Sequence, residues 1–147
     1  MTLDLTYRNV QTMVSCVNVD WEKCVTAKGF QAAFPGIPRD VALAQAYFFR
    51  TQQVFCQKST LKTVLAQWDC MQAATATKHY HKVKDCSSRI NSRNPCTVEN
   101  EKARCNSLPL ESCGATLQAV ACRSEEQVSI VKRLSTDSQI CKFDCRF

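Results

Sequence analysis

Residues 86–122 read CSSRINSRNPCTVENEKARCNSLPLESCGATLQAVAC, with a cysteine at every eighth to tenth residue. An interval of that length corresponds to about two turns of an α-helix. Short helices with a cysteine at each such interval can be joined to one another by disulfide bonds. The stretch therefore predicts a stack of helices held together by disulfides.

The 147-residue chain contains 11 cysteines, and two kinds of chemistry could use them. Structural zinc sites need close pairs such as C-x2-C, often with histidine. The only close pair here is Cys141 with Cys145, and the only histidines are His79 and His81. We therefore predict disulfides, whose pairing the spacing does not determine, for these residues: Cys16, Cys24, Cys56, Cys70, Cys86, Cys96, Cys105, Cys113, Cys122, Cys141 and Cys145.

The odd number of cysteines bears on assembly. About five bridges within the chain would leave one thiol, because 11 is odd. That thiol would either pair with a second chain, giving a disulfide-linked homodimer, or stay free and buried. The sequence leaves both alternatives open.

The disulfides also indicate where the protein works. Persistent disulfides are typical of secreted proteins, so we expect a secreted, extracellular protein. Residues 1–7 lack the apolar run of a signal peptide, and we interpret this as a signal peptide that has been removed. No stretch approaches the ~18 apolar residues of a membrane span, so we expect a soluble protein.

The composition favours helices over strands. Only three glycines and four prolines occur, which is too few for the tight turns of a β-sandwich. Apolar residues recur at helical spacing along most of the chain. We predict one all-α domain, residues 1–147, that folds as a compact disulfide-stapled bundle of about five to seven helices. The expected helices are 3–26, 40–57, one capped by Ser59, 85–92, 97–106, 110–122, and one that begins at a capping box at Ser124.

Individual side chains within these helices are expected to face the core. The helix from Asp40 has an apolar face made of Val41, Leu43, Ala44, Tyr47, Phe48, Val54 and Phe55. In the helix capped by Ser59, the side chains expected to point inward are Leu61, Val64, Leu65, Trp68 and Met71. The Pro/Gly loop at 34–38 breaks the helical pattern. Its neighbours Phe30, Phe34 and Ile37 are expected to fold back over the core as a lid, or else to stand out as a contact.

The most concentrated polar feature is a basic stretch in the middle of the chain. It contains Lys78, His79, Tyr80, His81, Lys82 and Lys84. On a strand the two imidazoles would share a side, whereas on a helix they would diverge by about 200°. The stretch is either a solvated basic loop or a contact patch for an acidic partner or anionic surface.

Other functional classes lack their sequence signals. The chain has no G-x-S-x-G, no H-E-x-x-H and no Gly-rich phosphate loop. The pair Glu125-Glu126 is explained by the start of a helix, where acidic side chains are favourable. A net charge of +6 without clustered basic and aromatic residues does not indicate nucleic-acid binding. We therefore expect no enzyme, no cofactor, no metal ion and no nucleic-acid partner.

The cysteine positions in the second half of the chain form a pattern. They include Asp85-Cys86, Cys96, Cys105, the turn Glu111-Ser112-Cys113, and Cys122 before the amphipathic segment 125–134. This pattern resembles a cysteine-rich secreted helical family of unknown function that is abundant in nematodes. The resemblance implies a helical fold and secretion, and it implies no activity.

Three functions remain compatible with a rigid, extracellular helical scaffold. The leading hypothesis is binding to an extracellular protein or receptor, because disulfides lower the ordering cost of association. The second is a carrier of a hydrophobic small molecule or lipid, which would need a cavity in the core. The third is a membrane- or channel-directed toxin.

Overall fold

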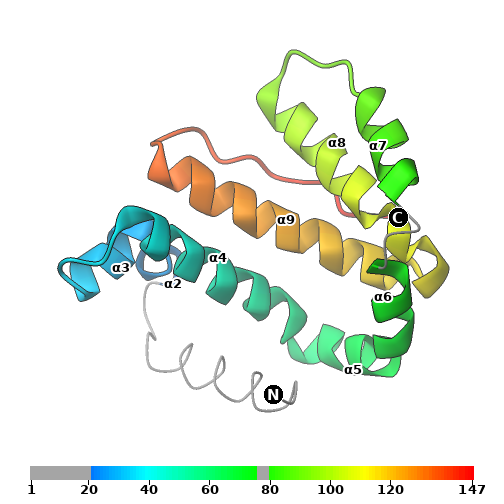
Figure 1. Cartoon of the computed structure of the whole chain (residues 1–147), viewed down its shortest axis with the longest axis horizontal. Helices are drawn as coiled ribbons and strands as arrows, with labels where there is room; N and C mark the ends of the chain where they lie inside the picture. The colour runs from blue at the N-terminus through cyan, green and yellow to red at the C-terminus, as the bar shows by residue number, and fades with distance from the viewer. Residues whose placement is uncertain (1–20, 76–79) are drawn as a thin grey trace. The chain divides into compact units, whose positions relative to one another are not determined.

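The structure is a computed structural model that describes residues 21–75 and 80–147 (Figure 1). Within these two ranges every regular element is a helix, so the predicted all-α, disulfide-stapled fold is confirmed. The elements are α2 (Trp21–Cys24), α3 (Ala27–Ala33), α4 (Arg39–Phe55), α5 (Lys58–Ala66), α6 (Trp68–Thr75), α7 (Tyr80–Ser88), α8 (Pro95–Ser107), the 3-10 helix η2 (Leu108–Cys113) and α9 (Ala115–Ser135).

The packing of the chain divides it into two compact units. The first comprises Met1–Cys56 and Gln127–Ile140, and the second comprises Gln57–Glu126 and Cys141–Phe147. The boundary falls within α9, whose C-terminal part belongs to the first unit. The single domain expected from the sequence, residues 1–147, stays a prediction.

The first unit is built around a small apolar core. Val25, Ala46 and Val131 are buried there, and partly buried apolar side chains pack around them: Phe30, Leu43, Tyr47 and Phe49. The rings of Phe30 and Phe49 stack with their centroids 5.8 Å apart, which joins α3 to α4. Phe30 thus covers the core as predicted, whereas Phe34 of the predicted lid is exposed.

A tight corner separates α2 from α3. Thr26 caps α3, because its side-chain oxygen accepts a hydrogen bond from the Gly29 backbone N–H at 3.0 Å. Gly29 lies inside α3, although glycine is usually a helix breaker. A Cβ atom at this position would collide with the carbonyl oxygen of Cys24. The close approach of the two backbone segments therefore requires glycine at position 29.

Helix α4 begins one residue earlier than the sequence suggests. Pro38 occupies the N-cap position and Arg39 is the first helical residue, so Asp40 lies in the first turn. The predicted loop at 34–38 is confirmed. The predicted apolar face is correct for Val54, which is buried, and wrong for Val41, Ala44 and Phe48, which are exposed. The buried stripe of α4 consists instead of Ala42, Ala46, Arg50 and Val54.

Helix α5 differs from the prediction at its start and on its surface. It begins at Lys58 after the N-cap Gln57, so Ser59 is inside the helix and does not cap it. Val64 is buried as predicted. Leu65 of α5 and Trp68, the first residue of α6, are exposed, which contradicts their predicted inward orientation.

The remaining helix ends follow local capping chemistry. Asn94 caps α8, and its side-chain oxygen accepts hydrogen bonds from the N–H groups of Cys96 and Thr97. Pro95 fills the first helical position, where its missing N–H costs nothing. In contrast, the capping box predicted at Ser124 is wrong, because α9 runs unbroken through that residue.

Four disulfides connect the elements of the second unit. Cys70 of α6 bonds Cys113 at the end of η2, and Cys86 of α7 bonds Cys105 of α8. The irregular segment 141–147 is held by two more, Cys96–Cys141 and Cys122–Cys145. Cysteines thus hold both ends of this tail against α8 and α9. Of the three other cysteines, Cys24 and Cys56 carry free thiols and Cys16 lies outside the described residues.

Candidate functional site

The basic stretch predicted as a contact patch lies on α7. The side chains of Tyr80, His81, Lys82 and Lys84 are all exposed there. Lys78 and His79 belong to the predicted patch but lie outside the described residues. Residues 80–84 are helical, so the loop alternative is wrong for this part of the stretch.

Helix α7 has one face turned toward its neighbour and one toward solvent. Val83, Cys86 and Ser87 are partly buried, and α7 packs against α8 (Figure 1). The disulfide Cys86–Cys105 fixes this packing covalently. The opposite face is therefore presented on a helix whose position within the second unit is constrained.

Tyr80 is the most exposed large apolar side chain among the described residues, with 66 % of its surface accessible. Its ring contacts the imidazole of His81 edge-on, with the ring centroids 6.2 Å apart. Tyrosine combines a large apolar ring with a polar hydroxyl, which suits it to contacts with other proteins. An exposed aromatic ring thus lies at the start of the helix that carries Lys82 and Lys84.

Positive charge continues along the chain past the predicted patch. Segment 80–93 contains four cations and one acid: Lys82, Lys84, Arg89, Arg93 and Asp85. Arg89 and Arg93 are exposed and follow the end of α7 at Ser88, so they add positive charge next to the helix. The predicted patch does not include Arg89 and Arg93, because the sequence indicates a polar stretch up to residue 84 and a separate helix from residue 85.

A shallow hollow lies between α7 and α8. It has a volume of about 260 Å³ and is open to solvent. Its lining consists of the Cys86–Cys105 disulfide with Arg89, Ile90, Glu101 and Arg104. This hollow is open to solvent, unlike the enclosed cavities in which carriers hold lipids.

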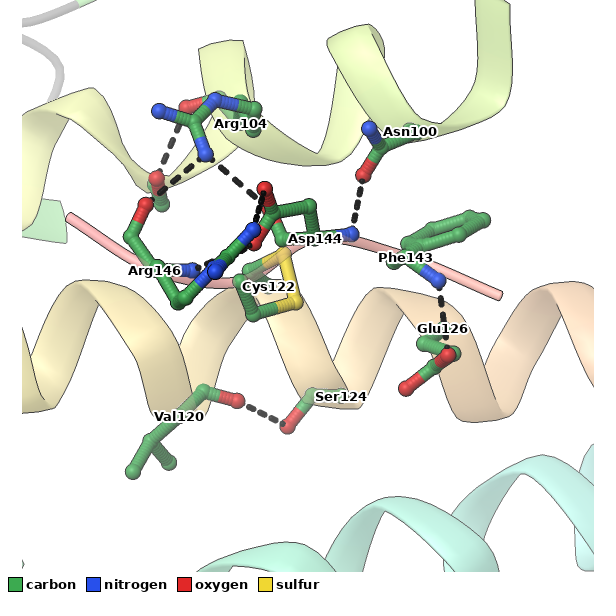
Figure 2. The surroundings of a disulfide bond; sticks show 11 residues. Asn100, Arg104, Val120, Cys122, Ser124, Glu126, Phe143, Asp144 and Arg146 are labelled. Atoms are coloured by element: carbon green, nitrogen blue, oxygen red, sulfur yellow. Dashed lines mark hydrogen bonds and ion pairs between the residues drawn. A yellow bond between two sulfur atoms is a disulfide. The ribbon is translucent and has the colours of Figure 1, made fainter. Parts of the chain in front are cut away.

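The C-terminal segment forms a second polar feature of the same unit. Figure 2 shows it running between α8 and α9 beside the Cys122–Cys145 disulfide. Arg104 of α8 donates to the backbone oxygens of Asp144 and Arg146, at 3.0 and 2.8 Å. Glu126 of α9 accepts a hydrogen bond from the Phe143 N–H at 2.8 Å. The segment is therefore fixed by side chains of both helices as well as by disulfides.

Charged side chains within the tail pair with each other. Arg146 donates two hydrogen bonds to the Asp144 carboxylate, at 2.7 and 2.8 Å. These bonds from Arg146 lower the pKa of Asp144 from 3.8 to about 2, so the carboxylate is ionised at neutral pH. The Arg104 guanidinium also lies 4.6 Å from the centre of the Phe147 ring. The Asp144 carboxylate and the Arg104 guanidinium are thus engaged by groups of the tail and are less available to a partner.

Two further hollows are open to solvent and lined largely by charged or polar residues. One, of about 350 Å³, lies beside the tail and includes Arg123, Glu126 and Arg146. The other, of about 260 Å³, lies in the first unit beside Lys28 and Asp137. Neither resembles the enclosed apolar cavity in which carriers hold lipids.

The two free thiols of the described residues differ in accessibility. Cys24 is exposed, whereas Cys56 is buried at the end of α4. Burial raises the pKa of the Cys56 thiol above its ordinary value, so the reactive thiolate is disfavoured there.

Residues 21–75 and 80–147 contain no group of three His, Cys, Asp or Glu side chains arranged to hold a metal ion. In the same ranges no helix is long and apolar enough to cross a membrane. Comparison with known proteins finds no family model, no curated protein and no solved structure that matches the chain. The nematode family resemblance therefore stays a prediction, and function has to be argued from the site itself.

Proposed function

We propose that the chain is an extracellular binding protein that engages an acidic surface of a partner protein through α7. The observation that carries this proposal is the 66 % exposure of Tyr80 beside the cations of the same helix. Lys84 lies one helical turn beyond Tyr80 on the same side of α7, Lys82 is exposed between them along the chain, and Asp85 is the only acid in segment 80–93. The contact surface proposed here consists of Tyr80, His81, Lys82 and Lys84, and we call it the α7 patch.

The chemistry of the α7 patch favours a protein partner. Tyrosine and arginine are enriched among the residues that contribute most to protein–protein affinity, because they place large rigid groups in pockets of the partner. Cations around such an anchor steer an acidic partner and raise the association rate. An aromatic anchor with flanking lysines therefore suits a pocket surrounded by carboxylates.

The scaffold beneath the α7 patch supports the same proposal. Helix α7 is bonded to α8 by Cys86–Cys105, and α8 is bonded to the tail by Cys96–Cys141. A surface that is already ordered loses little conformational freedom when it binds. Disulfides are also compatible with the extracellular setting in which such a partner would be met.

The test is a binding measurement with charge-reversed variants. Oxidised full-length protein is screened against an array of extracellular receptor domains, and the Kd of each hit is measured at low and physiological salt. We expect Lys82→Glu/Lys84→Glu to weaken binding by about tenfold or more and to abolish most of its salt dependence. Tyr80→Ala should weaken binding by a similar factor at both salt concentrations, because its contribution is not electrostatic.

A matched control lies in the same unit. Lys58 and Lys62 are exposed on α5, and Lys58→Glu/Lys62→Glu changes the net charge by the same amount. This control should bind like the wild type. Equal loss of affinity in both double variants would mean that overall charge, and not the α7 patch, determines binding. Unchanged affinity in Lys82→Glu/Lys84→Glu would exclude the α7 patch as the contact surface.

A further inference from the structure

Helix α4 has an exposed stripe that the proposed function does not use. Val41, Ala44, Gln45 and Phe48 are all exposed. Their spacing of three, four and seven residues puts them on one face of the helix. We call this set the α4 stripe. The other side of α4 is buried in the first unit, so the helix presents apolar side chains both inward and outward.

The α4 stripe is free of charge. Between Val41 and Phe55 the only charged residue is Arg50, whose side chain is buried. The exposed face of a surface helix ordinarily carries charged and polar residues. An uncharged face that includes Phe48, at 48 % exposure, is therefore unusual for a helix that meets only water.

Charge also limits which partner suits this face. The whole chain carries a net charge of +6, so two copies repel each other over most of their surface. The α4 stripe is a place where two copies can meet without bringing like charges together. An acidic partner, in contrast, would find no cation there.

The α4 stripe is self-complementary when two helices run antiparallel. Its midpoint lies between Ala44 and Gln45, and the larger Val41 and Phe48 lie at equal distances on either side. A two-fold axis through this midpoint places Phe48 of one copy against Val41 of the other. The smaller Ala44 then lies near the axis, where the helices approach most closely. Such an arrangement is the isologous interface of a symmetric dimer.

We infer that the α4 stripe is a self-association surface, occupied by the α4 stripe of a second copy in antiparallel orientation. Phe34, in the loop before α4, is also exposed and adds apolar surface in the same unit. The exposed parts of Phe34 and Phe48, 59 % and 48 % of aromatic areas of about 200 Å², amount to roughly 430 Å² in two copies. Stable interfaces bury about 1,200–2,000 Å², so the dimer is reversible and depends on concentration.

Sedimentation equilibrium of the oxidised full-length chain over a wide concentration range tests this inference. Cys24→Ser is used as the common background, because it removes the one exposed thiol of the described residues. We expect reversible dimerisation, weakened about tenfold or more by Phe48→Glu. Leu65→Glu is the matched control, since Leu65 is also 48 % exposed but lies on α5 in the other unit. This control should dimerise like the background protein.

A mixing experiment tests the orientation. Val41→Lys alone should also weaken dimerisation, because it places a lysine against Phe48. A mixture of Val41→Lys and Phe48→Glu should associate more tightly than either variant alone, since an antiparallel pair brings the new lysine against the new glutamate. Failure of the mixture to associate would overturn the antiparallel α4 interface.

Two other outcomes would overturn the inference as a whole. One is a background protein that stays monomeric at every concentration, which would mean that the α4 stripe does not bind a second copy. The other is a Phe48→Glu variant whose monomer has a clearly lower Tm than that of Leu65→Glu. The α4 stripe would then be covered within one chain.

Discussion

Arg50 is the largest fully buried side chain among the described residues, and its guanidinium is surrounded by acceptors. It donates to the backbone oxygens of Val25 and Glu22, both at 2.7 Å. It also donates to the side-chain oxygens of Glu22 and Gln127, at 2.7 and 3.2 Å. A buried charge is costly unless hydrogen bonds compensate it, and here they come from α2, the α2–α3 corner and α9. One side chain therefore joins three parts of the first unit.

Replacing this guanidinium should destabilise the protein strongly. We expect Arg50→Met to lower the free energy of unfolding by about 3–5 kcal/mol, because the buried carbonyl oxygen of Val25 and the partly buried one of Glu22 lose their donor. Denaturation in urea, followed by circular dichroism, measures this loss.

The matched control for Arg50 is its charged partner. The Glu22 side chain is 72 % exposed, so its ion pair with Arg50 is largely screened by solvent. Glu22→Gln keeps an oxygen acceptor and should cost less than about 1 kcal/mol. Equal losses in the two variants would show that the ion pair, and not the backbone hydrogen bonds, holds Arg50 in place.

The sequence contains a pattern that indicates the burial of Arg50, but the more hydrophobic residues of α4 obscure it. Ala42, Ala46, Arg50 and Val54 follow one another at intervals of four residues and form the buried stripe. The more hydrophobic Val41 and Phe48 suggested a different inward face. Alanine allows close packing in spite of its low hydrophobicity, so a ranking by hydrophobicity selected the wrong side of α4.

At the scale of elements, the clearest departure from the prediction is α9. The residues 124–127 match the capping box S-x-x-Q, but the Ser124 hydroxyl donates to the backbone oxygen of Val120 within the helix, at 3.1 Å (Figure 2). A capping residue needs a non-helical backbone before the helix begins. Here the preceding residues, from Ala115 onward, are already helical. The motif therefore occurs inside a helix, where it has no capping role.

This difference predicts how α9 responds to substitution. Ser124→Ala should change the free energy of unfolding by no more than about 0.5 kcal/mol, because alanine is the better helix former and no cap is lost. Asn94→Ala is the matched control, since Asn94 does cap α8, and it should cost about 1 kcal/mol. A Ser124→Ala loss as large as that of Asn94→Ala would contradict the continuous helix. Thermal and urea unfolding of both variants measure the difference.

Other elements could be predicted because their signals are local. The loop at 34–38 follows from its prolines and glycine, and helices lie where the apolar repeat is regular. Helix starts were less predictable, because Pro38 and Gln57 hold N-cap positions without a side-chain cap hydrogen bond. The residues of the α7 patch were identified from the sequence. The structure adds that residues 80–84 lie on one helix, which the disulfide Cys86–Cys105 bonds to α8.

At the scale of the whole molecule, the disulfides seen among the described residues are confined to one unit. All four bridges seen in the described residues connect cysteines of the second unit, whereas the free thiols of Cys24 and Cys56 belong to the first. Spacing could not predict this distribution, because it leaves the pairing open. The two units are therefore stabilised differently. The second adds disulfides to buried apolar residues such as Leu117 and Val120, whereas the described part of the first has a small apolar core and the buried Arg50.

Reduction should consequently affect the two units to different degrees. The bridges close loops of 43, 19, 45 and 23 residues. In the chain-entropy model each such bridge contributes about 3–4 kcal/mol by restricting the unfolded chain. We expect dithiothreitol to remove amide hydrogen-exchange protection from α7 and α8 while α3 and α4 keep theirs, as measured by mass spectrometry of peptic fragments.

The Arg50→Met variant provides the opposite perturbation in the same experiment. In its oxidised form it should lose protection first in α3 and α4, because the guanidinium supports the first unit, while the bridges still hold α7 and α8. Regional protection of this kind is expected where parts of a protein open separately. If reduction and Arg50→Met each removed protection from all four helices together, the two units would unfold as one cooperative domain. Helix α9 contributes residues to both units and would then be the element that couples them.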